Sequence, residues 1–141
     1  MCIRDSIYCS DYNIGASEVL RQMATDCKFT FNDTNSETSH LSRRLRITNS
    51  HASKGILNVT SDLDDLTSSD HMLLYLTAQT WTRAAESESL AAELEMAMAA
   101  GVHILLVHEM TGRGQEERHG CEFAKFFSCE DGATPERLLQ V

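Results

Sequence analysis

The chain has 141 residues, of which 42% are hydrophobic and 23% charged, and these values suit one globular domain with a single core. Its net charge of −9 repels the phosphate backbone of nucleic acids, which argues against nucleic acid as a partner. The longest apolar runs are too short to cross a bilayer, so we expect no membrane segment. Five cysteines without a CxxC pair argue against a disulfide framework and favour a cytoplasmic location.

The N-terminal part predicts a strand, a loop and a helix. Residues 1–6 fit no periodic pattern, and we interpret them as a non-native leader before a single domain over 7–141. The apolar run Ile7–Cys9 predicts the first strand. Gly15 then opens a segment with helical spacing of its apolar residues, which stops near Cys27.

The next segment is more polar. Residues 29–54 begin with a run rich in Ser, Thr, Asn and Asp, so we expect a polar loop or insertion there. Within it, the alternation over 45–48 indicates an edge strand. A stronger strand candidate covers 56–60, and Ser61 is placed to cap a short acidic helix that follows it.

The clearest unit of the chain is a strand, a helix and a second strand. His71–Leu76 and Val102–Val107 are continuous apolar runs, as in strands buried on both faces of a parallel sheet. Between them, Glu86–Ala100 has an apolar stripe at helical spacing, with Ser87 or Ser89 as its cap. A right-handed βαβ crossover is the natural arrangement of these three elements.

The C-terminal part predicts a loop and two short helices. Residues 111–120 are rich in charge and glycine, as in a loop, and Phe123–Phe127 suits an aromatic helix face. Pro135 is placed to begin a last helix. Because a doubly wound domain normally sends another strand back into its sheet, we expect the sequence to be truncated at its C-terminus and to lack its last strand.

Ligands of open parallel sheets bind beyond the carboxyl ends of the strands, where the strand order switches direction. This rule selects three loops, Ser10–Gly15, Thr77–Arg83 and His108–Gly120. His108 and Glu109 end the last predicted strand, and for them the alternative to ligand binding is a satisfied polar pair at the sheet edge. The candidate ligand-binding residues in these loops are Ser10, Asp11, Thr80, Trp81, His108 and Glu109.

Other motifs give weaker signals. Five possible ligands lie close together in the sequence but show no standard ligand spacing, so we predict no metal site. They are His103, His108, Glu109, His119 and Cys121. The phosphate-binding patterns GxGxxG and GxxxxGK[ST] are absent, and so is the GxSxG pattern of a nucleophilic serine.

Glu93 is the carboxylate that we single out. On a helical wheel it lies about 60° from Leu90, beside the apolar stripe of its helix. A glutamate at such a boundary can lean over a crevice of the sheet. The alternative is a surface residue that pairs with a neighbour on the helix.

Several of these segments resemble a known family, the TIR (Toll/interleukin receptor) domain. The similarity rests on Ile7–Ser10, Asp70–Leu76 leading to Thr80–Trp81, Glu86–Leu94 and Val102–Val107. It implies an α/β fold, a flavodoxin-like three-layer sandwich with a central parallel sheet. In NAD-cleaving TIR domains a glutamate of the corresponding helix is catalytic, and by position it resembles Glu93. Leu90 stands where the family usually has a cysteine, three residues before that glutamate.

The resemblance implies two functions. The first, which we favour, is a signalling module that needs no cofactor and assembles with itself or with protein partners. The second is an NAD+ glycohydrolase, with NAD as substrate and Glu93 stabilising the oxocarbenium-like transition state. A flavodoxin-like nucleotide or flavin binder is a third option.

Overall fold

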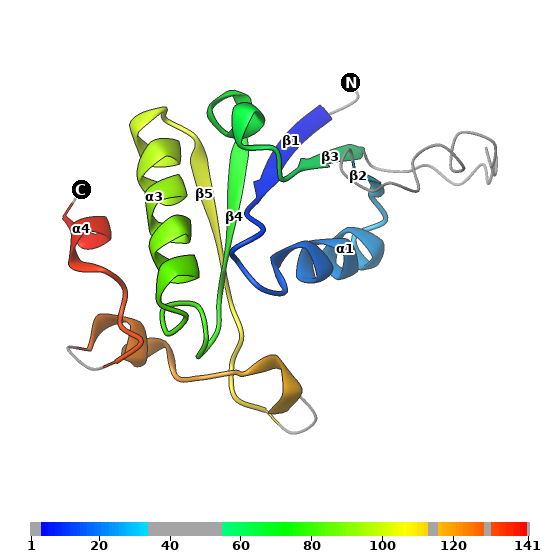
Figure 1. Cartoon of the computed structure of the whole chain (residues 1–141). Helices are drawn as coiled ribbons and strands as arrows, with labels where there is room; N and C mark the ends of the chain where they lie inside the picture. The colour runs from blue at the N-terminus through cyan, green and yellow to red at the C-terminus, as the bar shows by residue number, and fades with distance from the viewer. Residues whose placement is uncertain (1–3, 34–54, 113–115, 129–130, 141) are drawn as a thin grey trace.

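The computed structural model describes residues 4–33, 55–112, 116–128 and 131–140 (Figure 1). Five strands form one all-parallel sheet in the order β2-β3-β1-β4-β5. The strands are β1 Arg4–Cys9, β2 Thr30–Asp33, β3 Ile56–Thr60, β4 His71–Leu76 and β5 His103–His108. The helices are α1 Ala16–Asp26, α3 Ala85–Ala99 and α4 Glu136–Leu139, with short 3-10 turns η1 Leu63–Ser68, η2 Glu116–Arg118 and η3 Phe123–Phe127.

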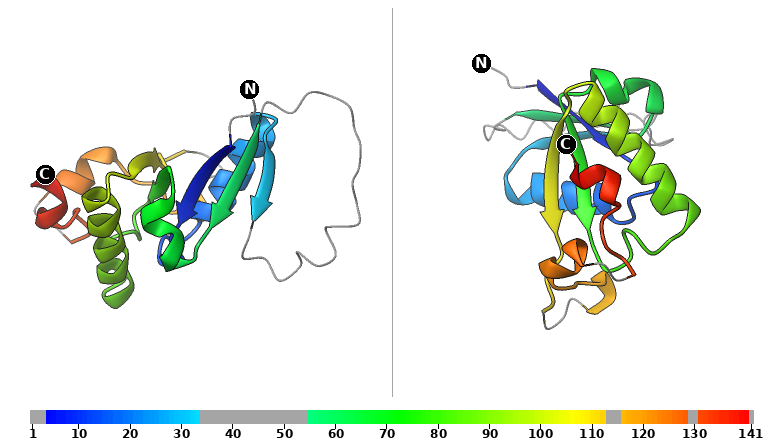
Figure 2. Two further views of the ribbon diagram at one scale, coloured as in Figure 1. Left: turned by 90° about the horizontal axis from the view of Figure 1, so that it is seen from above. Right: turned by 90° about the vertical axis from the view of Figure 1, so that its left-hand side faces the viewer.

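Helices on both faces make the fold a three-layer α/β sandwich, as predicted. Figure 2 shows α1 and α3 on opposite sides of the sheet. Neighbouring strand residues accordingly divide between two cores, because side chains alternate along a strand. Leu73 and Tyr75 pack on the α1 side, whereas Met72 and Leu74 pack on the α3 side. If β2 is set aside, the order β3-β1-β4-β5 matches the flavodoxin-like order 2-1-3-4, so β2 is an additional edge strand.

The start of the polar segment differs from the predicted loop. Thr30–Asp33 forms β2 and pairs with β3, although its sequence is polar. The partly buried Phe31 anchors it against the α1-side core. The edge strand predicted over 45–48 lies outside the described residues. At the N-terminus, β1 begins at Arg4, three residues before the apolar run that predicts it.

Two helix caps also differ from the predictions. Helix α3 starts after Ala84 and has no side-chain cap at its first turn. Ser87 instead accepts from the N–H of Arg83 at 3.0 Å and donates to the carbonyl of Thr80 at 2.8 Å. In η1 the capping side chain is Asp62, one residue after the predicted Ser61.

The prediction of two buried strands is right for β4 and wrong for β5. Five of the six residues of β4 are buried, whereas no residue of β5 is fully buried. The reason is position, because β4 lies between β1 and β5 while β5 stands last in the described sheet. Leu105 and Leu106 of β5 are 36% and 52% exposed.

None of the helices in the described part of the chain combines the length and the apolar character that spanning a bilayer requires.

Candidate functional site

The three loops selected by the strand-order rule converge on one pocket. The strand order changes direction between β1 and β4, because α1 after β1 covers one face of the sheet and α3 after β4 covers the other. The pocket lies at the carboxyl ends of these two strands. We call it the switch-point pocket; its volume is about 180 Å³. Its lining comes from all three loops, from one face of α1 and from the end of β4: Ile14, Gly15, Glu18, Val19, Gln22, Tyr75, Thr77, Gln79, Glu117, Arg118 and His119.

Tyr75, next to last in β4, organises the surroundings of the pocket. The side chain of Asn13 binds its main chain as a neighbouring strand would, donating Nδ2 to its carbonyl at 2.8 Å and accepting its N–H on Oδ1 at 2.7 Å. The hydroxyl of Thr80 donates to the same carbonyl at 3.1 Å. The Tyr75 hydroxyl donates to the Glu109 carboxylate. Burial, and then this hydrogen bond, raise the pKa of Tyr75.

Gly15 makes the approach of α1 to β4 possible. Its φ of +80° lies in the left-handed region, and a Cβ there would stand 3.0 Å from Cε1 of Tyr75. Both facts favour glycine, because other residues rarely adopt this conformation and the ring occupies the space.

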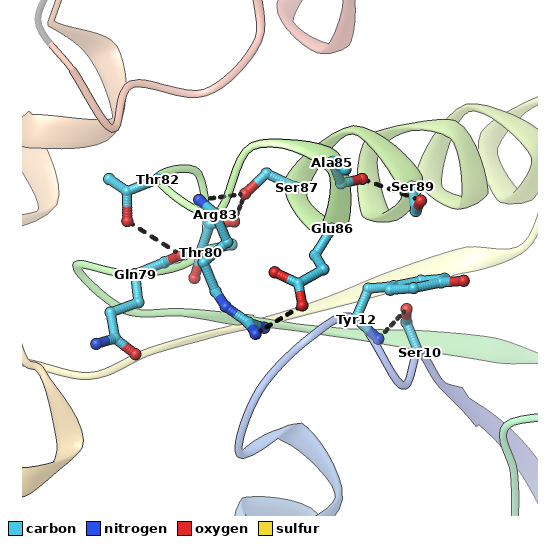
Figure 3. Close-up of polar contacts among 10 residues, drawn as sticks. All are labelled: Ser10, Tyr12, Gln79, Thr80, Thr82, Arg83, Ala85, Glu86, Ser87 and Ser89. Carbon is cyan, nitrogen blue, oxygen red and sulfur yellow. Dashed lines mark hydrogen bonds and ion pairs between the residues drawn. The ribbon is translucent and has the colours of Figure 1, made fainter.

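The loop between β4 and α3 is held by its own hydroxyl groups (Figure 3). Thr80 accepts the N–H of Thr77 at 2.8 Å, and its carbonyl accepts from Ser87. Ala84, at the start of α3, has a φ of 48°, which is unusual for a residue other than glycine and marks local backbone strain. Arg83 reaches Glu86 at 2.9 Å, where both side chains are partly exposed.

The structure places the predicted residues of this loop in the interior. Thr80 is 6% exposed, and its hydroxyl makes the contacts just described. Trp81 is 9% exposed and belongs to the core beneath α3. Their role in binding a ligand stays a prediction.

Ser10 and Asp11 line a different pocket, of about 250 Å³, at the carboxyl ends of β1 and β3. The hydroxyl of Ser10 accepts the N–H of Tyr12 at 3.1 Å and so shapes the turn (Figure 3). Beneath the turn, burial and the charges of Asp33 and Asp11 raise the pKa of Cys9 to about 12. That thiol is therefore a poor nucleophile.

His108 and Glu109 both have protein partners. Nε2 of His108 donates to the carbonyl of Cys121 at 2.7 Å, and its ring packs against Phe123 and Phe126. Glu109 is 7% exposed, accepts from the Tyr75 hydroxyl, and lies 3.9 Å from Nη1 of Arg118. These contacts are those expected for a satisfied polar pair, and they hold the chain after β5 against β4.

Glu93 lies on the opposite face of the sheet from the switch-point pocket. It is 7% exposed, so the surface alternative is wrong. Its Oε2 has no hydrogen-bond partner among the described residues. Burial, and then the nearby charge of Glu93, raise the pKa of Tyr8 in β1. Trp81 belongs to the core beneath the same helix, and Glu93 takes no part in the switch-point pocket.

In residues 4–33, 55–112, 116–128 and 131–140, no three His, Cys, Asp or Glu side chains are grouped so that they could hold one metal ion. Comparisons of the chain with protein-family models, with curated proteins and with solved structures found no match.

Sequence reasoning found the three loops but missed the residues that join them. Asn13 was predicted only as part of the loop Ser10–Gly15, and Tyr75 only as part of a buried strand. A usable signal was the asparagine shortly after a strand, because its amide can replace a main-chain partner on the next strand.

Proposed function

We propose that this chain is a TIR-like interaction module that assembles with itself or with partner proteins. The proposal is supported by the outer edge of β5, where main-chain groups face away from the sheet. His103 and Glu109 donate their N–H groups to main-chain oxygens on the β4 side. In a parallel ladder the intervening alternate residues, Ile104, Leu106 and His108, therefore turn their N–H and C=O groups outward.

This edge lacks the features that usually prevent strand pairing. The segment His103–His108 contains no proline and no Lys, Arg, Asp or Glu. Leu105 and Leu106 remain exposed on it. Edge strands of stable monomers usually carry charges, prolines or bulges, so an uncharged apolar edge favours pairing with another strand.

We expect the purified chain to form dimers or larger assemblies as its concentration rises, and Leu106→Lys to shift the molar mass to that of the monomer. The lysine places a charge at the centre of the edge without removing a buried contact. Light scattering coupled to size-exclusion chromatography measures the mass, and amide exchange at Ile104, Leu106 and His108 locates the pairing.

Met96→Lys is the matched control, because Met96 is 43% exposed on α3, away from the edge. It should leave the molar mass unchanged. A chain that stays monomeric at millimolar concentration, with fast exchange of the three amides, contradicts assembly with itself. Equal effects of both lysine substitutions contradict the assignment to β5.

A specific observation favours NAD+ glycohydrolase as the second candidate function. A buried carboxylate oxygen without a partner is costly, and such groups are frequent at functional sites. Oε2 of Glu93 is such an atom. This candidate stands second because the Glu93 side chain is only 7% exposed.

For this second candidate, we expect nicotinamide release from NAD by the wild-type chain, and its loss in Glu93→Gln, which keeps the size of the side chain and removes its charge. Chromatography quantifies nicotinamide, and circular dichroism checks the fold. Glu95→Gln, on the exposed side of α3, is the control. Absence of turnover at every protein concentration, or unchanged turnover in Glu93→Gln, counts against the enzyme.

A further inference from the structure

We propose that the switch-point pocket binds a small organic cation, an amine attached to an apolar body of about one ring. The proposal is independent of the β5 edge and of Glu93. It rests on where the pocket lies, on what forms its floor and on the charges around it.

The location is the one at which open parallel sheets bind ligands. Three segments far apart in the sequence meet there: Ile14 and Gly15 before α1, Thr77 and Gln79 after β4, and η2 after β5. The η2 segment is fixed to the site, because the carbonyl of His119 accepts the N–H of Ala78 at 2.8 Å. The walls of the pocket are therefore linked by hydrogen bonds.

The floor of the pocket suits an apolar group. Val19 and Tyr75 line it together with Gly15, which adds no side chain, and Tyr75 is 3% exposed. A cavity of about 150 Å³ holds one benzene molecule. A pocket of about 180 Å³ therefore has room for one ring and a short substituent.

The charges at the rim favour a cation. Glu117 lines the pocket, and no described residue forms an ion pair with it. Glu18 also lines the pocket, but its carboxylate pairs with Arg21 at 2.8 Å, so Glu117 is the carboxylate left for a cation. The one arginine of the lining, Arg118, donates to Gln22 at 3.1 Å and lies 3.9 Å from the buried Glu109 carboxylate. Its charge is thus offset within the protein. The net charge of −9 attracts cations in addition.

Three probes of similar shape and different charge test the proposal: benzylamine, benzyl alcohol and benzoate. We follow the amide signals of Val19, Gln79 and His119 by NMR during titration. Benzylamine should shift these signals to saturation with a Kd in the millimolar range, as expected for about eight heavy atoms. Benzyl alcohol should bind at least about tenfold more weakly, and benzoate should not saturate.

Variants separate the pocket from general attraction to an acidic protein. Glu117→Gln should weaken the binding of benzylamine several-fold and leave the affinity for benzyl alcohol unchanged. Asp26→Asn changes the net charge equally at the far end of α1 and should have no effect. Ile14→Trp, at a residue that is 47% exposed, should fill the pocket and abolish binding without disturbing the core.

Three results would overturn the proposal. The first is the absence of saturable shifts with benzylamine. The second is benzoate binding as tightly as benzylamine. The third is an equal loss of benzylamine affinity in Glu117→Gln and Asp26→Asn, because it assigns the attraction to the net charge of the protein and not to the pocket.

Discussion

Asn13→Ala should lower the free energy of unfolding by about 3 kcal/mol. The substitution removes two buried hydrogen bonds and leaves the N–H and C=O of Tyr75 without the partner that Asn13 supplies. An unsatisfied buried polar group costs about 1–3 kcal/mol. The Thr80 hydroxyl still donates to the Tyr75 carbonyl, which limits the total loss of stability. Urea unfolding followed by circular dichroism measures the change.

Asp11→Ala is the control, because Asp11 is an exposed residue of the same turn. It should change stability by less than about 0.5 kcal/mol. A loss below 1 kcal/mol in Asn13→Ala would show that water or a shifted loop replaces the amide, and Asn13 would then not be the link between β1 and β4.

Gly120→Ala should destabilise the protein by about 2–3 kcal/mol and disturb the switch-point pocket. A Cβ on Gly120 would lie 2.4 Å from the main-chain oxygen of Met110, closer than real Cβ contacts allow. The backbone must separate there, which strains the bonds from Cys121 to Glu109 and from Ala78 to His119. Unfolding curves and NMR signals of the pocket report the two effects.

Gly101→Ala separates a steric clash from conformational strain. Gly101 has a φ of +76°, and no atom lies within 4 Å of the place where its Cβ would be. We expect a cost of about 1 kcal/mol from the backbone conformation alone. If Gly120→Ala costs no more than this and leaves the pocket signals in place, the close approach to Met110 does not hold the loop.

The α/β class and the βαβ unit were predictable because hydrophobic periodicity reports burial. The same rule failed for the last strand. His71–Leu76 and His103–His108 have nearly the same apolar pattern, yet only the first is buried on both faces. Their difference lies in the strand order, which no local pattern contains. The polar strand β2 was missed for the same reason, since its pairing with β3 is a tertiary effect.

The site was predictable as loops but not as side chains. The strand-order rule identified the three loops that line the switch-point pocket. Local sequence does not tell which polar groups of a loop face a ligand and which hold the loop together. Thr80 was selected as a ligand-binding residue and supports the loop, whereas Arg118 was not selected and lines the pocket.

The central position of β1 has a consequence for synthesis on the ribosome. Strand β1 comes before β3 and β4 in the chain but lies between them in the sheet, and its partners on the β4 side are 64 positions further along the chain. At about 5–20 residues per second, the ribosome needs several seconds to reach those partners. During that time the apolar side chains of Ile7 and Tyr8 have no sheet to enter. The nascent chain should therefore bind chaperones early and release them once β4 has left the ribosome.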